Sequence, residues 1–379
     1  MTSWVMLYFL AMRSGKMAAI LKDLYSPELI EAIGQATTQL LPSFDSGKLL
    51  KGCLTADWSA LKLMERRDRL TTQLHVQLPA DFALAAPIIQ QVGQQFTGLA
   101  AVVFPNYVAT YGLEDWQLSM ALLADLTQYS SAEFAIRPFL VRYPEQTSQQ
   151  MLHWAHSESA AVRRLASEGI RPRLPWGLRL TQYVDDPTPI MPILTQLIFD
   201  DSEYVQKSVA NNLNDISKDH PELVIAFAQK YWRQNDRTDW VLKQGLRTLF
   251  KQGVPAVLQL QGYDIQAAKL LEPVSLTPTT QTAAMGTTSL LHYQVTAKQP
   301  VPVYLGYRVH YVRQNKTDAF KDFFVKRTTL KKGTPLTGDL KIKWRQLTTR
   351  RLYEGIHTIE LLVNTQVVAQ SQVDLTQIE

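Results

Sequence analysis

The chain of 379 residues contains a single cysteine, Cys53, and this scarcity excludes several classes of site. One thiol cannot form an intramolecular disulfide or a cysteine-based metal site, which suits a reducing compartment. A lone cysteine in a helical pattern is usually buried, and we expect this of Cys53. Among seven histidines, only His153 and His156 are close in sequence. Because they have no third ligand nearby, we expect them to be exposed on a helix and predict no metal or other cofactor.

Long apolar runs are also missing. The run Trp4–Met12 is far shorter than the roughly 20 apolar residues of a membrane span. Arg13 and Lys16 follow this run instead of preceding it, and no small-residue cleavage site comes after it, so we expect no secretory signal. Met17 is an alternative candidate for the start. These features predict a cytoplasmic protein that does not bind membranes.

An excess of one charge sign is missing from most of the chain, but the net charge is unevenly distributed. The net charge is +5, yet 14 Lys and Arg face 7 Asp and Glu from Pro273 to the end. The basic character therefore lies in the C-terminal quarter, which suggests contact with a polyanion. A basic surface that only keeps the domain soluble explains the composition equally well.

Helical periodicity dominates the chain up to about Gly262. Apolar residues recur at helical spacing in Leu29–Leu41, Leu61–Leu78 and Ser119–Leu126, and proline-containing turn signals separate such stretches. Three segments also resemble one another, namely Ser157–Ala166, Asp201–Val209 and Arg237–Leu246. Aligning their valines, Val162, Val205 and Val241, gives spacings of 43 and 36 residues, near those of HEAT and armadillo repeats. Stacked helix pairs with these valines turned inward would form a solenoid whose concave face suits an elongated partner.

The pattern changes after Leu271. Pro273–Thr288 has the composition of a linker or an edge strand, and alternating segments rich in β-branched and aromatic residues follow. These segments are Leu290–Val295, Val301–Val312, Phe323–Thr329, His357–Val363 and Val367–Val373. About seven short strands predict a β-sandwich. The predicted fold class is therefore mainly α, with a HEAT-like helical-repeat solenoid over residues 17–271 and an all-β sandwich over residues 273–379.

The stretch from Ser131 to Pro221 contains the candidate chemistry. Glu133, Glu168 and Asp215 stand where the second helix of each predicted pair would face the concave side. Between Glu168 and Trp176 lie two arginines and two prolines, with little that is apolar. Because proline fixes the backbone, this segment would present Arg171, Arg173 and Trp176 from a stiff loop, as a binding site does.

Several segments of this stretch are long and unusual. They are Ala135–Leu140, Arg163–Gly169, Arg171–Trp176, Ser208–Asp215 and Lys218–Pro221. Together they resemble the signature segments of AlkC-type DNA alkylation repair glycosylases. The resemblance runs from about Leu21 to the end, because Tyr304–Asn315 is similar to the immunoglobulin-like domain that some members carry. Lys316 stands where a glycine is usual in the family.

The resemblance implies a solenoid that holds damaged double-stranded DNA and hydrolyses the N-glycosidic bond of cationic alkylated bases, chiefly 3-methyladenine, without full base flipping. It carries over three acids, Glu133, Glu168 and Asp215, with Trp176 as the aromatic member. We expect a monomer. The alternative function, which is not enzymatic, is a non-catalytic helical-repeat scaffold that binds nucleic acid or protein.

The chemistry of such a lesion suits these residue types. A cationic base leaves as a neutral molecule, whereas the sugar develops positive charge as the bond stretches. A carboxylate near that carbon stabilises the charge and can orient or deprotonate water, which we assign to Asp215 and Glu168. Glu133 would help to bind the cationic base, and Trp176 could face it for about 0.5–2 kcal/mol. Outside the family resemblance, an acid on a repeat helix is usually solvent-exposed or a cap.

Cations and one amide are candidates for phosphate contacts, which supply affinity without sequence information. In the repeats these are Arg163, Arg164, Arg171, Arg173, Lys207, Lys218 and Asn211, and in the predicted sandwich they are Lys316, Lys321 and Lys326. Residues 131–251 contain nearly as many acids as bases, so a basic groove would require that the two signs lie on different faces.

Overall fold

The computed structural model describes residues 21–313, 319–345 and 351–376, which form two compact units that meet between Asp219 and His220. Each unit is described by itself. The expectations for Trp4–Met12, Met17 and Lys316 lie outside the described residues. Within them, no helix has the length and the apolar character needed to cross a membrane.

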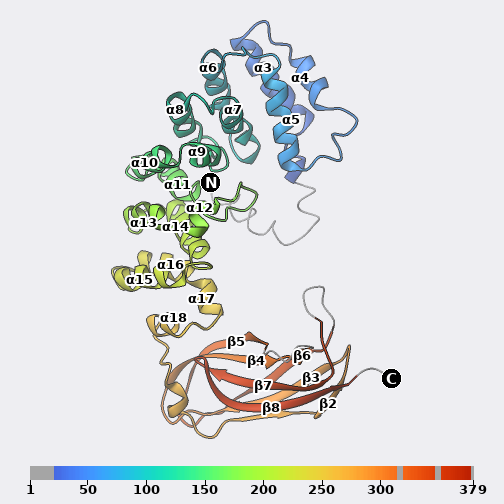
Figure 1. The fold of residues 1–379 in the computed structure, drawn as a ribbon, viewed down its shortest axis with the longest axis vertical. Coiled ribbons are helices and arrows are strands. Elements are labelled where there is room, and N and C mark those ends of the chain that lie inside the picture. Colours follow the sequence, from blue (N-terminus) through green and yellow to red (C-terminus); the bar gives the residue numbers. More distant parts are fainter. Residues whose placement is uncertain (1–20, 314–318, 346–350, 377–379) are drawn as a thin grey trace. The chain divides into compact units, whose positions relative to one another are not determined.

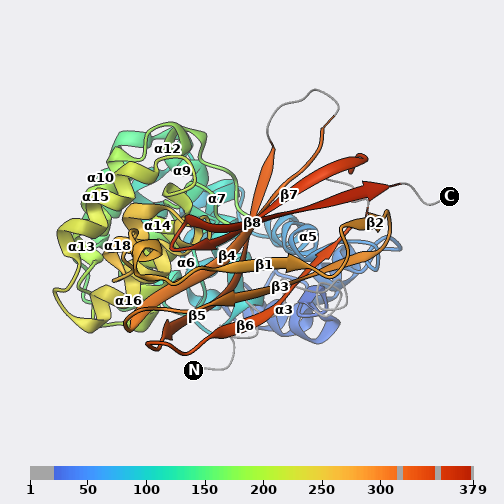
Figure 2. The ribbon, with the colours of Figure 1, turned by 90° about the horizontal axis from the view of Figure 1, so that it is seen from below.

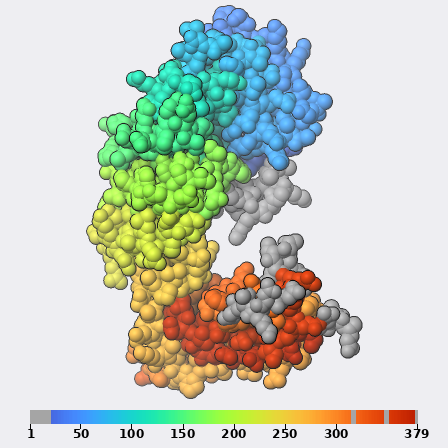
Figure 3. Space-filling model, in the orientation of Figure 1, coloured from blue at the N-terminus to red at the C-terminus, as the bar shows by residue number. Residues whose placement is uncertain are grey.

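The first unit is built from helices that follow one another in chain order (Figures 1 and 3). They are α3 (Pro27–Leu40), α4 (Ser46–Cys53), α5 (Leu63–His75), α6 (Phe82–Gly93), α7 (Val103–Tyr111), α8 (Trp116–Leu126), α9 (Ile136–Arg142), α10 (Pro144–Trp154), α11 (Ala160–Glu168), α12 (Thr181–Asp185), α13 (Met191–Leu197) and α14 (Glu203–Ile216), with 3-10 turns η1 (Leu99–Val102) and η2 (Thr188–Ile190). The three stretches with the clearest helical periodicity correspond to α3, α5 and α8, as predicted.

The helix boundaries follow local capping chemistry. Ser26 caps α3 by accepting a hydrogen bond from the Leu29 amide, and Asp115 caps α8 in the same way. Pro144 begins α10, where its missing N–H costs nothing. Cys53 at the end of α4 is buried, as expected. His153 and His156 are both exposed, at and just beyond the end of α10.

The predicted repeat is present as a packing unit. Val162 in α11 and Val205 in α14 are buried, and so is Val241 in α16 (Asp236–Gly245) of the second unit. In the first unit α11 packs directly against α14. Asn212 of α14 donates from Nδ2 to the Ser167 carbonyl at 2.8 Å, which ties the end of α11 to its successor. This bond fits the role of asparagines as ladder residues between helical repeats.

The second unit begins with short helices and ends in a β-sandwich (Figure 2). The helices are α15 (Pro221–Tyr231), α16, α17 (Arg247–Lys251) and α18 (Pro255–Leu260), followed by the 3-10 turn η3 (Ala267–Leu270). The strands are β1 (Ser275–Pro278), β2 (Thr282–Ala284), β3 (Thr288–Val295), β4 (Val301–His310), β5 (Phe320–Leu330), β6 (Leu336–Lys343), β7 (Gly355–Val363) and β8 (Gln366–Thr376). The predicted fold class, helical repeats followed by an immunoglobulin-like sandwich, is confirmed.

Two sheets form the sandwich, with strand orders β1-β3-β6 and β2-β8-β7-β4-β5. Apolar side chains from both sheets, with Trp344 fully buried among them, fill the space between. The five segments predicted as strands correspond to β3, β4, β5, β7 and β8. The strand β6 was not among the predicted segments, although Leu336, Gly338, Leu340 and Ile342 alternate with exposed residues along it. Asn364 and Thr365 form the turn that joins β7 to β8, with positive φ angles of 48° and 72°.

Candidate active site

The three predicted acids lie in the first unit. Glu168 is the last residue of α11, and Asp215 lies in the last turn of α14. Glu133 occupies the turn before α9, so the expectation that it lies on a helix is wrong. Pro138 has no N–H and is tolerated only near the start of a helix, so α9 begins at Ile136 and leaves Glu133 outside it.

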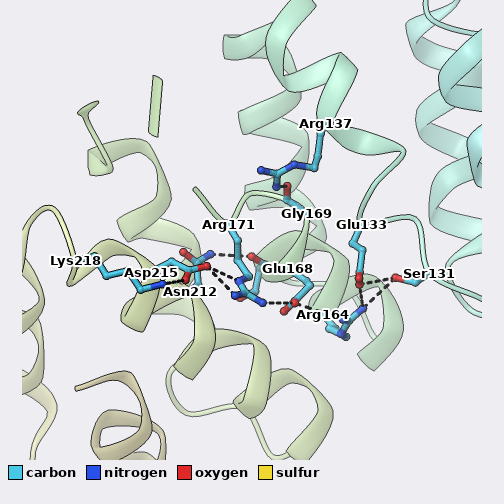
Figure 4. A network of polar contacts seen from close by, with 11 residues as sticks. Ser131, Glu133, Arg137, Arg164, Glu168, Gly169, Arg171, Asn212, Asp215 and Lys218 are labelled. Carbon is cyan, nitrogen blue, oxygen red and sulfur yellow. Dashed lines mark hydrogen bonds and ion pairs between the residues drawn. The ribbon is translucent and has the colours of Figure 1, made fainter. Parts of the chain in front are cut away.

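All three acids are buried, with exposed fractions of 5%, 5% and 2% for Glu133, Glu168 and Asp215. Because a buried charge is costly without a partner, each must be matched by a cation or by hydrogen bonds. Figure 4 shows that cations separate one acid from the next. An acid on a repeat helix is usually exposed to solvent, but Glu168 and Asp215 are not.

Alternating charges connect the three acids. Arg164 Nη1 lies 2.6 Å from Glu133 Oε2, and its Nη2 lies 3.7 Å from Glu168 Oε1. Arg171 then donates from Nη1 to Glu168 Oε1 at 2.6 Å and from Nε to Asp215 Oδ2 at 2.8 Å, and its Nη2 lies 2.8 Å from that same oxygen. Lys218 Nζ lies 2.8 Å from Asp215 Oδ1. We call these six residues the charge chain: Glu133, Arg164, Glu168, Arg171, Asp215 and Lys218.

The charge chain keeps Glu168 ionised. Burial by itself raises the pKa of this carboxyl, but the cations Arg171 and Arg164 outweigh it and hold the pKa below its usual range. Glu168 is therefore a carboxylate at neutral pH. A group in this state can stabilise a neighbouring positive charge, but it has no proton to donate.

The loop between α11 and α12 is held by a residue that the sequence did not single out as functional. Arg137 of α9 is fully buried and donates from Nη1 to the Gly169 carbonyl at 2.7 Å and from Nε to the Leu178 carbonyl. Burial and the nearby Arg171 lower the pKa of Arg137 to about 10. The two carbonyls lie at opposite ends of the loop that contains Arg171. The signal available in the sequence was a cation inside an apolar stretch, Ala135–Leu140.

Trp176 lies on this same loop. Its side chain is 47% exposed, and its φ of 64° falls in a region that bulky residues rarely adopt. The adjacent Gly177 has little space around it, because an added Cβ would lie 3.3 Å from Arg137 Cδ. The loop therefore presents an exposed indole, while Arg137 holds both of its ends.

The predicted phosphate contacts in the repeats occupy different environments. Arg164 and Arg171 are enclosed in the charge chain, with side chains only 14% and 8% exposed. Arg163 is bonded to Asp200 at 2.6 Å and Arg173 to Asp219 at 2.7 Å. The structure thus assigns four of these arginines a protein partner, and their contact with phosphate stays a prediction.

The remaining predicted contacts are more accessible. Lys207 is 46% exposed and pairs with Glu203 on the same helix at 3.2 Å, while Asn211 is half-buried on α14. In the second unit Lys321 and Lys326 are both exposed on β5. These positions are open to a polyanion, and DNA binding by them stays a prediction.

Comparison with known proteins identifies relatives along most of the chain. Residues 61–249 match the family described as DNA alkylation repair enzyme, and residues 273–377 match the C-terminal Ig-like domain of the uncharacterised protein YhaZ. The uncharacterized protein YhaZ of Bacillus subtilis is 37% identical over 349 residues, which cover 92% of this chain and 97% of that protein. The structure of the Pseudomonas fluorescens alkylpurine DNA glycosylase AlkC, bound to DNA containing an abasic site analog, matches with a TM-score of 0.77 and 34% identity over 94% of this chain and 98% of that one.

Proposed function

Because the chain belongs to the DNA alkylation repair enzyme family, we propose that it is an alkylpurine DNA glycosylase that cuts the N-glycosidic bond of cationic bases, with 3-methyladenine as its chief substrate. The observation that carries this proposal is the set of three buried carboxylates, Glu133, Glu168 and Asp215, joined by the charge chain. A scaffold would gain little net stability from burying three acids, since buried ion pairs often contribute less than apolar packing of the same volume.

The proposed reaction needs little acid catalysis. When the bond between the base and C1′ breaks, the electron pair goes to the base and neutralises its positive charge. The sugar then carries a developing cation, which a fixed carboxylate stabilises. Asp215 is the candidate for this role because Arg171 holds its Oδ2 in a defined position, while its Oδ1 is bonded only to the exposed side chain of Lys218 among the described residues.

Water completes the proposed reaction at C1′. Its oxygen forms the new bond to the sugar, and its proton passes to Asp215 acting as general base. Glu168, which shares Arg171 with Asp215, supplies further negative charge. Glu133 is assigned to binding of the cationic base, and Trp176, exposed on the adjoining loop, to a cation–π contact with the base or sugar. That contact weakens once the base is neutral, which favours its release.

The partner in this proposal is double-stranded DNA, which we expect a monomeric protein to bind in the cytoplasm. The helical repeats of residues 17–271 would carry the site, and the sandwich of residues 273–379 would clamp the duplex through Lys321 and Lys326. The cations of the repeats, among them Arg163, Arg173, Lys207 and Lys218, and the amide of Asn211 would contact phosphates.

The direct test is base release. Purified protein in excess over DNA treated with a methylating agent should release 3-methyladenine, detected by chromatography, in a single turnover. DNA binding without release of any methylated base would contradict the proposal and leave the scaffold interpretation.

A further inference from the structure

Lys218 lies just beyond the end of α14, and its ammonium covers one oxygen of Asp215. Nζ is 2.8 Å from Oδ1, while Oδ2 is occupied by Arg171. The lysine side chain is 40% exposed, and the aspartate side chain only 3%. Among the described residues, Lys218 is the one side chain that donates a hydrogen bond to Oδ1. The oxygen that could face a substrate is therefore covered by an exposed side chain.

The two cations on Asp215 differ in how firmly they are held. Arg171 is 8% exposed, is bonded to Glu168 as well, and presents a rigid planar fork. Lys218 makes one ion pair among the described residues, with Asp215, at the end of a flexible four-carbon stem. Lys218 can therefore leave Asp215 without breaking any other contact of the charge chain.

A lysine three residues after an aspartate, at the C-terminal end of a helix, is by itself an ordinary stabilising pair. Two features set this one apart. The acid is almost fully buried and is already bonded to Arg171, which it shares with Glu168, so Lys218 is not its sole counterion. The ammonium also occupies the position from which Oδ1 would approach a cationic sugar, and two positive charges there would repel each other.

We propose that Lys218 is a displaceable counterion of Asp215. In the free protein its ammonium neutralises Oδ1; when damaged DNA binds, the ammonium moves to a backbone phosphate and Oδ1 becomes accessible to the sugar. No covalent bond changes in this step, and one ion pair is exchanged for another. The proposal rests on the proposed glycosylase function and gives it a source of selectivity for cationic lesions.

Charge accounts for that selectivity. The charge chain contains three acids and three bases, and the buried Arg137 also acts electrostatically on all three acids. Departure of Lys218 removes one positive charge from beside the reacting carbon. A cationic ligand then gains attraction that a neutral ligand of the same shape does not.

The experiment compares two duplexes that differ in one charge. One contains a neutral tetrahydrofuran abasic analogue and the other a cationic pyrrolidine analogue, and their dissociation constants are measured by fluorescence anisotropy at the same salt concentration. The variant is Lys218→Met. The matched control is Lys207→Met on the same helix, which removes a lysine paired with the exposed Glu203 instead of a buried acid.

Both variants should bind the neutral duplex more weakly, since each loses one predicted phosphate contact. In Lys218→Met, however, no ammonium competes for Oδ1, and the preference for the cationic duplex should rise roughly fivefold or more. The preference in Lys207→Met should equal that of the wild type.

Three results would overturn the proposal. A preference that is unchanged or reduced in Lys218→Met would mean that the lysine does not compete with a cation for Asp215, even if the wild type releases 3-methyladenine. A rise of the same size in Lys207→Met would mean that loss of any positive charge on this helix, and not release of Oδ1, causes the effect. A wild-type protein that releases no methylated base would overturn the proposed function and, with it, the counterion exchange.

Discussion

Arg171 bonds Asp215 at a single oxygen: its Nε donates a hydrogen bond to Oδ2 at 2.8 Å, and its Nη2 lies 2.8 Å from the same oxygen in an ion pair. The two residues are far apart in the chain, one in the loop after α11 and the other in the last turn of α14. Their contact therefore links two successive repeats at the proposed site. It also fixes the direction of the carboxylate, because the planar fork of an arginine imposes its own geometry on the acid.

Replacing Arg171 by Met should destabilise the protein severely. The change leaves Glu168 and Asp215 buried without their shared cation, which costs about 3–5 kcal/mol of the free energy of unfolding. Urea denaturation measures it. The control is Arg173→Met, whose partner Asp219 is partly exposed, and whose loss should cost about 1 kcal/mol or less. Equal effects of the two changes would contradict the assignment of Arg171 to the centre of the charge chain.

Replacing Asp215 by Asn should lower the rate of base release in a single turnover by roughly 10² or more, because the amide cannot stabilise the developing cation. DNA binding should persist. Asp219→Asn serves as the control, since that aspartate belongs to the Arg173 pair outside the charge chain, and it should retain most of the rate. Full activity in Asp215→Asn would remove this residue from the mechanism.

The lowered pKa of Glu168 predicts how stability depends on pH. A carboxyl whose pKa is lower in the folded than in the unfolded protein binds its proton less tightly when folded, so acid favours unfolding. The contribution is complete above the ordinary glutamate value of 4.5 and is lost as the pH falls through the lowered folded value. Denaturation between pH 7 and pH 3 should show this loss.

The variant Glu168→Gln isolates that contribution. It cannot titrate, so its free energy of unfolding should fall less steeply below pH 4.5 than that of the wild type. Glu203→Gln, at an exposed position, should leave the slope nearly unchanged. An identical slope in all three proteins would mean that the cations around Glu168 do not hold it ionised.

Arg137 should determine how firmly the loop between α11 and α12 is fixed. Arg137→Lys keeps the charge but cannot hold both carbonyls, Gly169 and Leu178, in the same fork. Trypsin should then cut faster after Arg173, and mass spectrometry of the fragments measures the rate. Arg142→Lys, an exposed change on the same helix, should not alter it. Equal cleavage in Arg137→Lys and the wild type would show that the loop is held by other contacts.

Periodicity predicted the repeats, and alternation predicted most of the sandwich, because both patterns are written in consecutive residues. Buried Val162 and Val205 follow from the repeat alone. The strand β6 was missed although its residues alternate, because Gly338, Asp339 and its two lysines are residue types depleted in strands. Glu133 was expected on a helix, but Pro138 is tolerated only near a helix start, and α9 begins after Glu133.

The resemblance pointed to the three acids that the structure brings together, but not to their partners, and their role in catalysis stays a prediction. Glu168 and Asp215 come from segments with unusual composition, whereas the distance between their carboxylates depends on the register of α11 against α14. Arg164 and Arg171 were predicted to contact phosphate, as exposed arginines do. The structure encloses both between acids, and no sequence rule tells which face of a repeat a cation occupies once long-range packing decides it.

The basic strand β5 can be tested more cleanly by substitution than by deletion of residues 273–379. Within the second unit the sandwich is bonded to the preceding helices and turns: Tyr304 Oη donates to the Lys251 carbonyl at 3.3 Å, and Asn364 Nδ2 to the Asp264 carbonyl at 2.7 Å. Removing the sandwich would expose those surfaces and confound a loss of DNA affinity with a loss of folding.

The full chain carrying Lys321→Gln and Lys326→Gln avoids this difficulty. Both lysines are exposed on β5, so the double change should leave the unfolding midpoint within error. If both contact phosphate, the slope of log Kd against log salt should fall by about 2, since each phosphate contact contributes about 0.9. Lys269→Gln, an exposed lysine of η3, gives the effect of one charge removed elsewhere in the unit. A slope equal to that of the wild type would mean that β5 faces solvent and that the DNA is held by the helical repeats alone.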